Sequence, residues 1–375
     1  MPAIPMVDLQ GQYNSIKSAV DSAIHSVLDS TQFINGPAVG AFARQLADYL
    51  HVAHVIPCAN GTDALQIALM ALDLKPGDEV ITASFTFVAT AEVIALLQLK
   101  PVFVDVDPES FTLDPAQVEA AVTPKTRCII PVHLFGQGAD MEALMQIAAR
   151  HNLYVVEDNA QAIGADYTFP DGRSQKLGTI GHIGCTSFFP SKNLGCYGDG
   201  GAVFTNDSNL AEKINCIANH GSRERYFHDE VGVNSRLDTI QAAILSVKLP
   251  LLDQYNQARQ EAAARYNEQL KGVAGITTPK VARYSTHVYH QYTLLLDKRR
   301  DEVQQLLQAQ QISSAIYYPV PLHLQKAYHY LGYQPGDLPV AESLAARVLS
   351  LPIHTELSPL VQEFIVEHLL KAYHS

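Results

Sequence analysis

The stretch TSFFPSKNLGCYGDGGAVFTN, residues 186–206, organises the rest of this chain. It begins as an apolar, aromatic strand that breaks at Pro190, and a short polar loop with one lysine, Lys192, follows. A glycine-rich turn at 198–201 then leads into a second apolar strand at 202–205. Because desolvation disfavours the ammonium form, a lysine between two buried strands is expected to lose its proton and react with carbonyls. Taken alone, the pattern favours a plain surface-loop lysine beside a tight turn.

Length and composition describe a soluble globular chain of two domains. The 375 residues, 47% of them hydrophobic, suffice for a large core. A net charge of −12 argues against a nucleic-acid partner, and the hydrophobic runs are too short to span a membrane. The N-terminus lacks the features of a signal peptide. Five cysteines without CxxC spacing indicate reduced thiols rather than a zinc site. We therefore expect a cytoplasmic protein without a metal.

Short apolar strands alternate with helices over the first half of the chain. After helices within 6–50, the expected strands lie at 54–58, 79–82, 101–104, 128–132 and 153–157, and further helices are expected at 87–97 and 141–151. This alternation indicates a parallel sheet covered by helices on both faces. Beyond residue 206 the expected elements are helices at 209–218, 238–270 with an interruption near Pro250, 301–310, 340–349 and 360–373 and a strand at 290–296. The sequence predicts a large domain, 1–250, and a smaller α+β domain, 251–375.

Ligands of such sheets bind beyond the carboxyl ends of the strands, where three motifs lie. The first is Asn60-Gly61-Thr62-Asp63, between a strand and a helix. Free backbone N–H groups and the helix dipole make an anion site there, and Gly61 permits close approach of the backbone. The alternative is a plain helix cap by Thr62 or Asp63 with nothing bound.

The second motif ends the strand at 153–157 with Asp158. An unpaired carboxylate at the end of an apolar strand is costly, and a protonated pyridine nitrogen is a suitable partner. Gln161, three residues on, is placed to hydrogen-bond the phenolic oxygen of such a ring. The alternative for Asp158 is a carboxylate that caps the following helix.

The third motif, Ser84-Phe85-Thr86-Phe87, brings an aromatic ring to a strand-to-helix junction, where it can stack on a planar ligand. The alternative is a core phenylalanine. Ser187, five residues before Lys192, can help to hold a phosphate, or it is simply a serine within a strand. The conjunction of a phosphate cradle, a ring partner, a stacking face and a nucleophilic lysine predicts pyridoxal 5′-phosphate (PLP) as the cofactor.

Over essentially its whole length the chain resembles the DegT/DnrJ/StrS family of sugar aminotransferases. The matching pieces are CANGTDALQIAL (58–69), ASFTFVATAE (83–92), VEDNAQAIGA (156–165), SFFPSKNLGCYGDGGA (187–202) and VGVNSRLDTIQAAIL (231–245). The last three are highly specific. The resemblance implies an α/β fold of PLP fold type I, with a mostly parallel sheet between helices in the large domain and a smaller C-terminal α+β domain.

The resemblance also implies a role for each matched residue. Lys192 would be the catalytic Schiff-base lysine, and Asp158 would face the pyridinium nitrogen. The other implied contacts to PLP are Gln161 at the phenolic oxygen, Phe87 stacked on the ring, and Gly61, Thr62 and Ser187 around the phosphate. In the family the asparagine of the GVNSR motif, here Asn234, reaches the phosphate of the neighbouring subunit. This implies an obligate homodimer with shared active sites.

Finer detail is similar to the members that aminate C3 of a keto-sugar nucleotide with L-glutamate as donor. Among them are those acting on UDP-2-acetamido-2-deoxy-3-keto-glucuronate, in cell-surface polysaccharide (O-antigen) biosynthesis. There, an arginine after the asparagine motif and a His-Tyr pair before Pro-x-Pro contact the sugar carboxylate. This chain has Arg236 and Tyr317-Tyr318, so the arginine and the second tyrosine are retained and the histidine is replaced. The alternative substrates are dTDP-linked 3-keto-6-deoxyhexoses.

Two further functions compete with transamination. A related PLP-dependent sugar dehydratase shares the fold but has histidine in place of the lysine, so Lys192 argues against it. A non-catalytic regulatory homologue would have no need of Lys192, Asp158 and Gln161 together. A lone histidine is more often structural than catalytic, and the catalytic set therefore omits the histidines near the expected site loops, namely His133, His220, His323 and His354.

Overall fold

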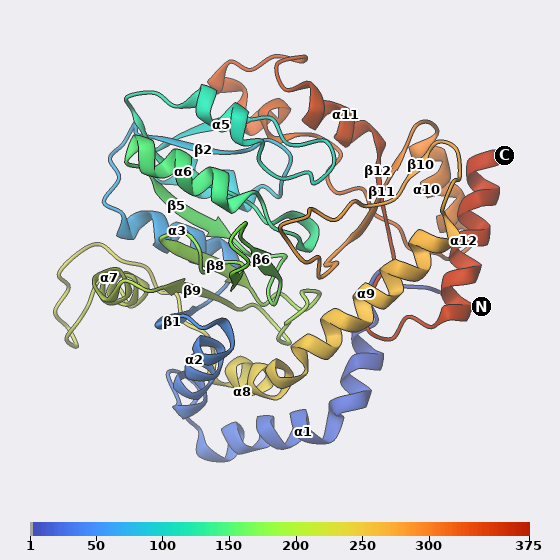
Figure 1. Ribbon diagram of the computed structural model, residues 1–375. Coiled ribbons are helices and arrows are strands. Elements are labelled where there is room, and N and C mark those ends of the chain that lie inside the picture. Colours follow the sequence, from blue (N-terminus) through green and yellow to red (C-terminus); the bar gives the residue numbers. More distant parts are fainter. Residues whose placement is uncertain (1–2) are drawn as a thin grey trace.

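The computed structural model describes residues 3–375, and a seven-stranded sheet lies at its centre (Figure 1). The strands lie in the order β1-β9-β8-β5-β4-β2-β3. Their bounds are β1 (His54–Cys58), β2 (Glu79–Ala83), β3 (Lys100–Val104), β4 (Thr126–Ile130), β5 (Tyr154–Asp158), β8 (Ile183–Ser187) and β9 (Gly201–Thr205). All share one direction except β9, which pairs antiparallel with both β8 and β1. The mostly parallel sheet confirms the predicted fold class.

Helices pack on both faces of this sheet (Figure 1). The α-helices are α1 (Leu9–Ser30), α2 (Pro37–Leu50), α3 (Gly61–Ala71), α4 (Ala89–Leu96), α5 (Pro115–Ala121), α6 (Met141–His151), α7 (Ser208–Ala218), α8 (Thr239–Lys248), α9 (Leu252–Gln269), α10 (Arg300–Ala309), α11 (Pro339–Arg347) and α12 (Pro359–His374). The 3₁₀ turns are η1 (Leu134–Gly136), η2 (Leu249–Leu251), η3 (Leu322–Leu324) and η4 (Lys326–Leu331).

Each central strand contributes to two cores, because consecutive residues of a strand point to opposite faces. On β5, Val155 packs in a cluster with residues of α5 and α6, whereas Val156 packs in a second cluster with residues of α3, α4 and α7. Both valines are fully buried. Burial on both faces explains why the strands appear in the sequence as continuous apolar runs rather than alternating ones.

The strands β8 and β9 form an antiparallel pair whose connection carries Lys192. Their register places Ser187 opposite Gly201, so the loop of residues 188–200 leaves and re-enters the sheet at neighbouring positions. Gly201 also lies against the start of α3: a Cβ atom there would come within 2.4 Å of the Asn60 carbonyl group. Only glycine allows this close approach of the two backbones.

A second, three-stranded antiparallel sheet lies in the C-terminal part, in the order β10 (Ile276–Thr277), β11 (Tyr292–Leu296) and β12 (Val348–Leu351). Its residues share a buried cluster with α9, α10 and α12, and Figure 1 shows these elements gathered beside both chain ends. The smaller C-terminal sheet agrees with the predicted architecture. The division of the chain at residues 250 and 251 stays a prediction.

Two local features differ from the sequence-based expectations. The helix expected at 340–349 ends at Arg347, and Val348–Leu351 forms β12. Pairing of β12 with β11 buries all four of its residues, and this gain overrides the helical pattern. A small hairpin of β6 (Asp166–Thr168) and β7 (Ser174–Lys176) was not expected at all.

No helix within residues 3–375 combines the length and the apolar character needed to cross a membrane.

Candidate active site

A cavity of about 460 Å³ opens where β1, β2, β5 and β8 end. Nine of the residues predicted for the site line it, namely Gly61, Thr62, Phe87, Asp158, Gln161, Ser187, Lys192, Tyr317 and Tyr318. The charged side chains among the lining residues are Asp158, Lys192 and Asp199. The structure therefore brings together one cation and two carboxylates around a space large enough for a small ligand.

The start of α3 forms one wall of the cavity. Asn60 caps this helix, because its side-chain oxygen accepts a hydrogen bond from the Asp63 N–H at 2.8 Å. The cap is therefore Asn60, and neither Thr62 nor Asp63 supplies it. Gly61 packs against Ser187 so closely that a Cβ atom would lie 2.6 Å from the serine Cβ. The N-terminus of α3 thus meets the end of β8, and its free N–H groups and dipole favour an anion there.

Lys192 lies in the loop between β8 and β9, partly buried in the cavity wall. Its backbone N–H closes a turn on the Phe189 carbonyl at 2.8 Å. Burial lowers the pKa of the Lys192 ammonium to about 8, and the nearby Asp158 carboxylate only partly opposes this shift. At pH 7 about a tenth of the side chain is therefore the neutral amine that a nucleophile and base requires, far more than for an ordinary lysine.

Two buried polar side chains hold this loop from the side of the protein core. The Asn193 amide nitrogen donates to Asn256 Oδ1 at 2.7 Å and to the Val288 carbonyl at 2.8 Å. Lys248 Nζ donates to the Gly195 carbonyl at 2.6 Å. Asn193 and Gly195 both follow Lys192 within three residues, so the backbone on the C-terminal side of this lysine is fixed.

Asp158 ends β5 at the cavity with 5% of its surface exposed. Its Oδ2 accepts a hydrogen bond from Thr90 Oγ1 at 2.8 Å, and its Oδ1 accepts one from the Ala160 N–H at 3.1 Å. Burial nevertheless raises the pKa of this carboxyl group above its usual value, against these two bonds and the charge of Lys192. A cationic partner in the cavity would stabilise the ionised form.

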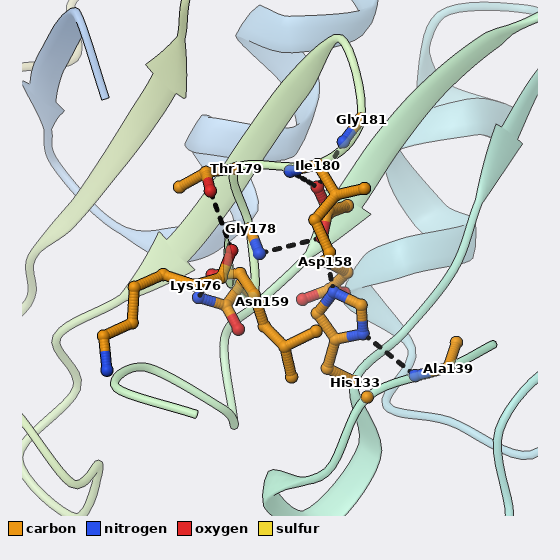
Figure 2. A network of polar contacts seen from close by, with 12 residues as sticks. His133, Ala139, Asp158, Asn159, Lys176, Gly178, Thr179, Ile180 and Gly181 are labelled. Carbon is orange, nitrogen blue, oxygen red and sulfur yellow. Dashed lines mark hydrogen bonds and ion pairs between the residues drawn. The ribbon is translucent and has the colours of Figure 1, made fainter. Parts of the chain in front are cut away.

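Glu157, the residue before Asp158, is also fully buried, but it is closed off from the cavity. Its carboxylate accepts four hydrogen bonds, from the N–H groups of Gly178 (2.8 Å), Ile180 (2.6 Å) and Gly181 (2.5 Å) and from His133 Nε2 (2.8 Å) (Figure 2). With four hydrogen-bond donors, the Glu157 carboxylate is satisfied without a cationic partner. The Asp158 carboxylate has only two such donors.

The His133 ring completes this buried network from the other side. Its Nδ1 accepts the Ala139 N–H at 3.2 Å, which leaves Nε2 as the protonated nitrogen that faces the Glu157 carboxylate (Figure 2). The His133 backbone N–H donates to the Asp158 carbonyl at 3.0 Å, so the same histidine also holds the end of β5. His133 is structural here and lies outside the cavity wall.

We expect Glu157→Gln to lower the free energy of unfolding by about 3 kcal/mol, because hydrogen bonds to a charged group contribute about 1.5–3 kcal/mol each. In addition, the side-chain NH₂ group of the glutamine would face backbone N–H groups, which are also donors and cannot accept a hydrogen bond. Urea unfolding of the cofactor-free protein measures the change. The matched control is Glu119→Gln, which removes an exposed carboxylate paired with Arg150 and His151. Equal losses in the two variants would contradict the structural role of Glu157.

Gln161, Tyr318 and Phe87 form another part of the cavity wall. Gln161 accepts the Phe135 N–H at 2.8 Å through Oε1 and donates from Nε2 to the Tyr318 hydroxyl at 3.1 Å. Phe87 is 52% exposed, with its ring 6.1 Å from that of Tyr318. Phe85, by contrast, is fully buried in the core. Of the two phenylalanines in the motif, only Phe87 has a face available for a ligand.

Asn234 and Arg236 do not line the cavity of their own chain. Asn234 is exposed and Arg236 half-buried. Between them, the buried Ser235 hydroxyl donates to Asp63 at 2.6 Å and accepts the Ala59 N–H at 3.0 Å. Within residues 3–375, Arg236 makes no ion pair or side-chain hydrogen bond. Ser235 thus connects this segment to α3 of the same chain. The side chains of Asn234 and Arg236 remain available for other contacts.

Sequence reasoning missed several polar cavity residues, among them His290 and Gln291 just before β11, and it missed Thr90 behind Asp158. No motif points to His290 and Gln291, which lie in the segment that leads into the small sheet. Thr90 lies at the start of α4 within the quoted 83–92 stretch, and its place in that stretch was the available signal. Of the histidines left out of the catalytic set, His133, His220, His323 and His354, none lines the cavity. Residues 3–375 contain no cluster of three or more metal-ligating side chains.

Comparison with known proteins gives matches along almost the whole chain. A model of the DegT/DnrJ/EryC1/StrS aminotransferase family matches residues 14–370. The chain is 50% identical over 372 residues to a pleiotropic regulatory protein of Geobacillus stearothermophilus, covering 99% of this chain and 98% of that protein. It is 50% identical over 354 residues to the UDP-2-acetamido-2-deoxy-3-oxo-D-glucuronate aminotransferase of Pseudomonas aeruginosa, covering 94% and 96%. It is 44% identical over 356 residues to a dTDP-3-amino-3,4,6-trideoxy-alpha-D-glucose transaminase of Streptomyces venezuelae, covering 95% and 92%.

Solved structures give the same result. DesV of S. venezuelae, solved in complex with a ketimine intermediate, superposes with a TM-score of 0.95 at 41% identity and covers all of both chains. NtdA from Bacillus subtilis, solved with the bound cofactor PMP, superposes with a TM-score of 0.90 at 31% identity, covering 100% of this chain and 86% of that one.

Proposed function

The chain belongs to the DegT/DnrJ/EryC1/StrS aminotransferase family, and from this premise we propose that it transfers the amino group of L-glutamate to C3 of UDP-2-acetamido-2-deoxy-3-keto-glucuronate. At the coarser level it is a nucleotide-sugar aminotransferase, and its cofactor is PLP. The observation that carries the choice of sugar is the 50% identity to the Pseudomonas aeruginosa enzyme named for that substrate.

The charges and the types of the cavity residues fit the chemical groups of PLP. The start of α3 with Gly61 and Thr62, next to Ser187, would hold the phosphate, because a helix N-terminus favours an anion. Asp158 would face the ring nitrogen, since this buried carboxylate has only two donors and a raised pKa. Gln161 would approach the phenolic oxygen and Phe87 the ring face. Lys192 would bind the cofactor covalently.

The side chains of this chain supply the acid–base steps of transamination. PLP, when bound, provides an electron sink for the bond that breaks. With a pKa of about 8, Lys192 gains and loses a proton near neutral pH. Its Nζ would take a proton from the donor's α-carbon and release it to the cofactor in the first half-reaction, and it would carry a proton from the cofactor to C3 of the sugar in the second. Asp158, paired with the protonated ring nitrogen, would keep its negative charge at the end of β5.

The site also requires cations that a single chain does not supply. Lys192 is the one cationic side chain among the residues that line the cavity. Glutamate carries carboxylates, the proposed sugar carries another, and the nucleotide carries a diphosphate. We propose that a second copy of the chain contributes Arg236 and Asn234, whose side chains are not engaged by their own cavity. The functional unit would then be a homodimer with shared sites, and Tyr317 and Tyr318 would complete the sugar pocket.

The prediction that tests this pocket is Arg236→Met, assayed on the two half-reactions separately. A planar guanidinium suits a carboxylate bidentately, and such charge-assisted contacts contribute about 1.5–3 kcal/mol, roughly tenfold to a hundredfold in kcat/KM. If the sugar is a uronate, both half-reactions should fall by this factor. Arg173→Met is the control, because Arg173 is exposed and pairs only with Asp171. Loss confined to the glutamate half-reaction would leave a neutral sugar as the substrate.

The runner-up substrate is a dTDP-linked 3-keto-6-deoxyhexose, favoured by the 44% identity to the S. venezuelae transaminase. A single experiment separates the two. The enzyme is loaded with the amino group of glutamate, freed of 2-oxoglutarate and offered a panel of keto-sugar nucleotides, while absorbance reports the return of the aldehyde form. Recovery with the UDP-linked 3-keto-uronate alone supports the proposal, and recovery with the dTDP-sugar alone overturns it. A cytoplasmic location and a role in O-antigen biosynthesis stay predictions.

A further inference from the structure

The proposed reaction gives no role to the hydrogen bond between Thr90 and Asp158. The Thr90 hydroxyl donates to Asp158 Oδ2 at 2.8 Å, across 68 positions of sequence. Thr90 is fully buried, and Asp158 is 5% exposed. The second donor to this carboxylate is the Ala160 N–H, which belongs to the same turn as Asp158. Thr90 is therefore the one side-chain hydrogen-bond partner that the carboxylate has within residues 3–375.

Local structure does not account for this threonine. Thr90 is the second residue of α4, where Val88 is the N-cap and no side chain caps the helix. A threonine inside a helix commonly bonds a carbonyl of the preceding turn. Here the hydroxyl instead points from α4 to the end of β5, so the bond links two elements rather than serving its own helix.

We propose that Thr90 is a positioning residue for transamination, whose hydroxyl holds the Asp158 carboxylate ionised and oriented at the cavity wall. The proposal rests on the pairing of Asp158 with the ring nitrogen of PLP. Two donors, Thr90 and Ala160, occupy two of the four lone-pair positions of the carboxylate and fix its rotation. The remaining positions serve the cofactor.

The electrostatic consequence follows from the surroundings of Asp158. Burial favours its neutral acid form, and the groups that oppose burial include the Thr90 hydroxyl, the Ala160 N–H and the charge of Lys192. The Thr90 bond is the largest of these opposing contributions. Without it, the carboxyl group holds a proton more readily and turns more freely. Both effects leave the ring nitrogen of the cofactor less protonated and weaken the electron sink.

The test replaces Thr90 with valine, which keeps the shape and removes the hydroxyl. Holoenzyme is prepared with PLP labelled with ¹⁵N in the ring, so that NMR reads the protonation of that nitrogen directly. We expect the signal to move toward the unprotonated position. We expect kcat to fall by about tenfold to a hundredfold while KM for glutamate changes by less than about threefold. Thr90→Ser, which restores a hydroxyl, should recover both values, and Thr90→Ala is a second variant without one.

The matched control is Thr82→Val. Thr82 is also fully buried, and its hydroxyl donates at 2.9 Å to the Ile130 carbonyl within the sheet. This variant should lose stability without moving the ¹⁵N signal. An unchanged signal in Thr90→Val and Thr90→Ala, together with a changed one in Asp158→Asn, would overturn the role of Thr90 alone. An unchanged signal in Asp158→Asn as well would instead remove the pairing of Asp158 with the ring.

Discussion

Replacing Lys192 with alanine should leave a protein that binds PLP without a covalent bond and has lost turnover. General acid–base catalysis by a positioned group contributes about 10²–10⁴-fold, and the covalent attachment is lost in addition. We therefore expect transamination to fall by more than about 10⁴-fold. Borohydride treatment followed by denaturation and mass spectrometry measures the covalent bond: it should fix the cofactor in the wild type and not in Lys192→Ala.

The control for this experiment is Lys213→Ala, which removes a lysine whose partner is Asp73. It should keep both turnover and covalent attachment. Near-normal transamination in Lys192→Ala would contradict the assignment.

The pH dependence gives an independent check on the same residue. Because burial lowers the pKa of Lys192 from 10.5 to about 8, the neutral amine accumulates as pH rises through that value. The rate at which the apoprotein captures PLP should thus rise with pH and level off above about 8.

Asp158→Asn is the second substitution with a large expected effect. It removes the negative charge that would keep the ring nitrogen protonated, and with it the electron sink. We expect kcat to fall by several orders of magnitude. The thermal midpoint should change little, because an amide satisfies burial without a charge. Steady-state kinetics and thermal unfolding of the holoenzyme measure the two quantities.

Asp114→Asn is the matched control, because the Asp114 carboxylate caps α5 and does nothing at the cavity. It should cost no activity. A loss of less than about tenfold in Asp158→Asn, roughly 1.4 kcal/mol of barrier, would mean that Asp158 only caps the turn that follows β5.

The sequence was informative wherever a feature is local. The strand at His54–Cys58 and the helix at Met141–His151 match the expected bounds because each is delimited by nearby polar or capping residues, such as Asp140 before the helix. The loop with Lys192 and the carboxylate of Asp158 were found for the same reason: each is marked by an abrupt change from apolar strand to polar turn.

Features that depend on distant parts of the chain escaped prediction. The direction of β9 depends on which strands it pairs with, and the sequence of β9 does not indicate those partners. The Thr90–Asp158 bond and the position of His290 in the cavity wall join segments far apart in sequence. The helix expected at 340–349 included Val348 and Leu349, and only pairing with β11 makes these residues part of a strand.

The pairing of Ser187 with Gly201 has a consequence for protein engineering. Because the loop of residues 188–200 begins and ends on adjacent, hydrogen-bonded positions, its length is not set by the span between its ends. Loops of other lengths from related enzymes are therefore transplantable between the same two strands without displacing the sheet. Asn193 and the Gly195 contact with Lys248 would have to be retained as fixed points. Such chimaeras would vary the surroundings of the reactive amine on a constant scaffold.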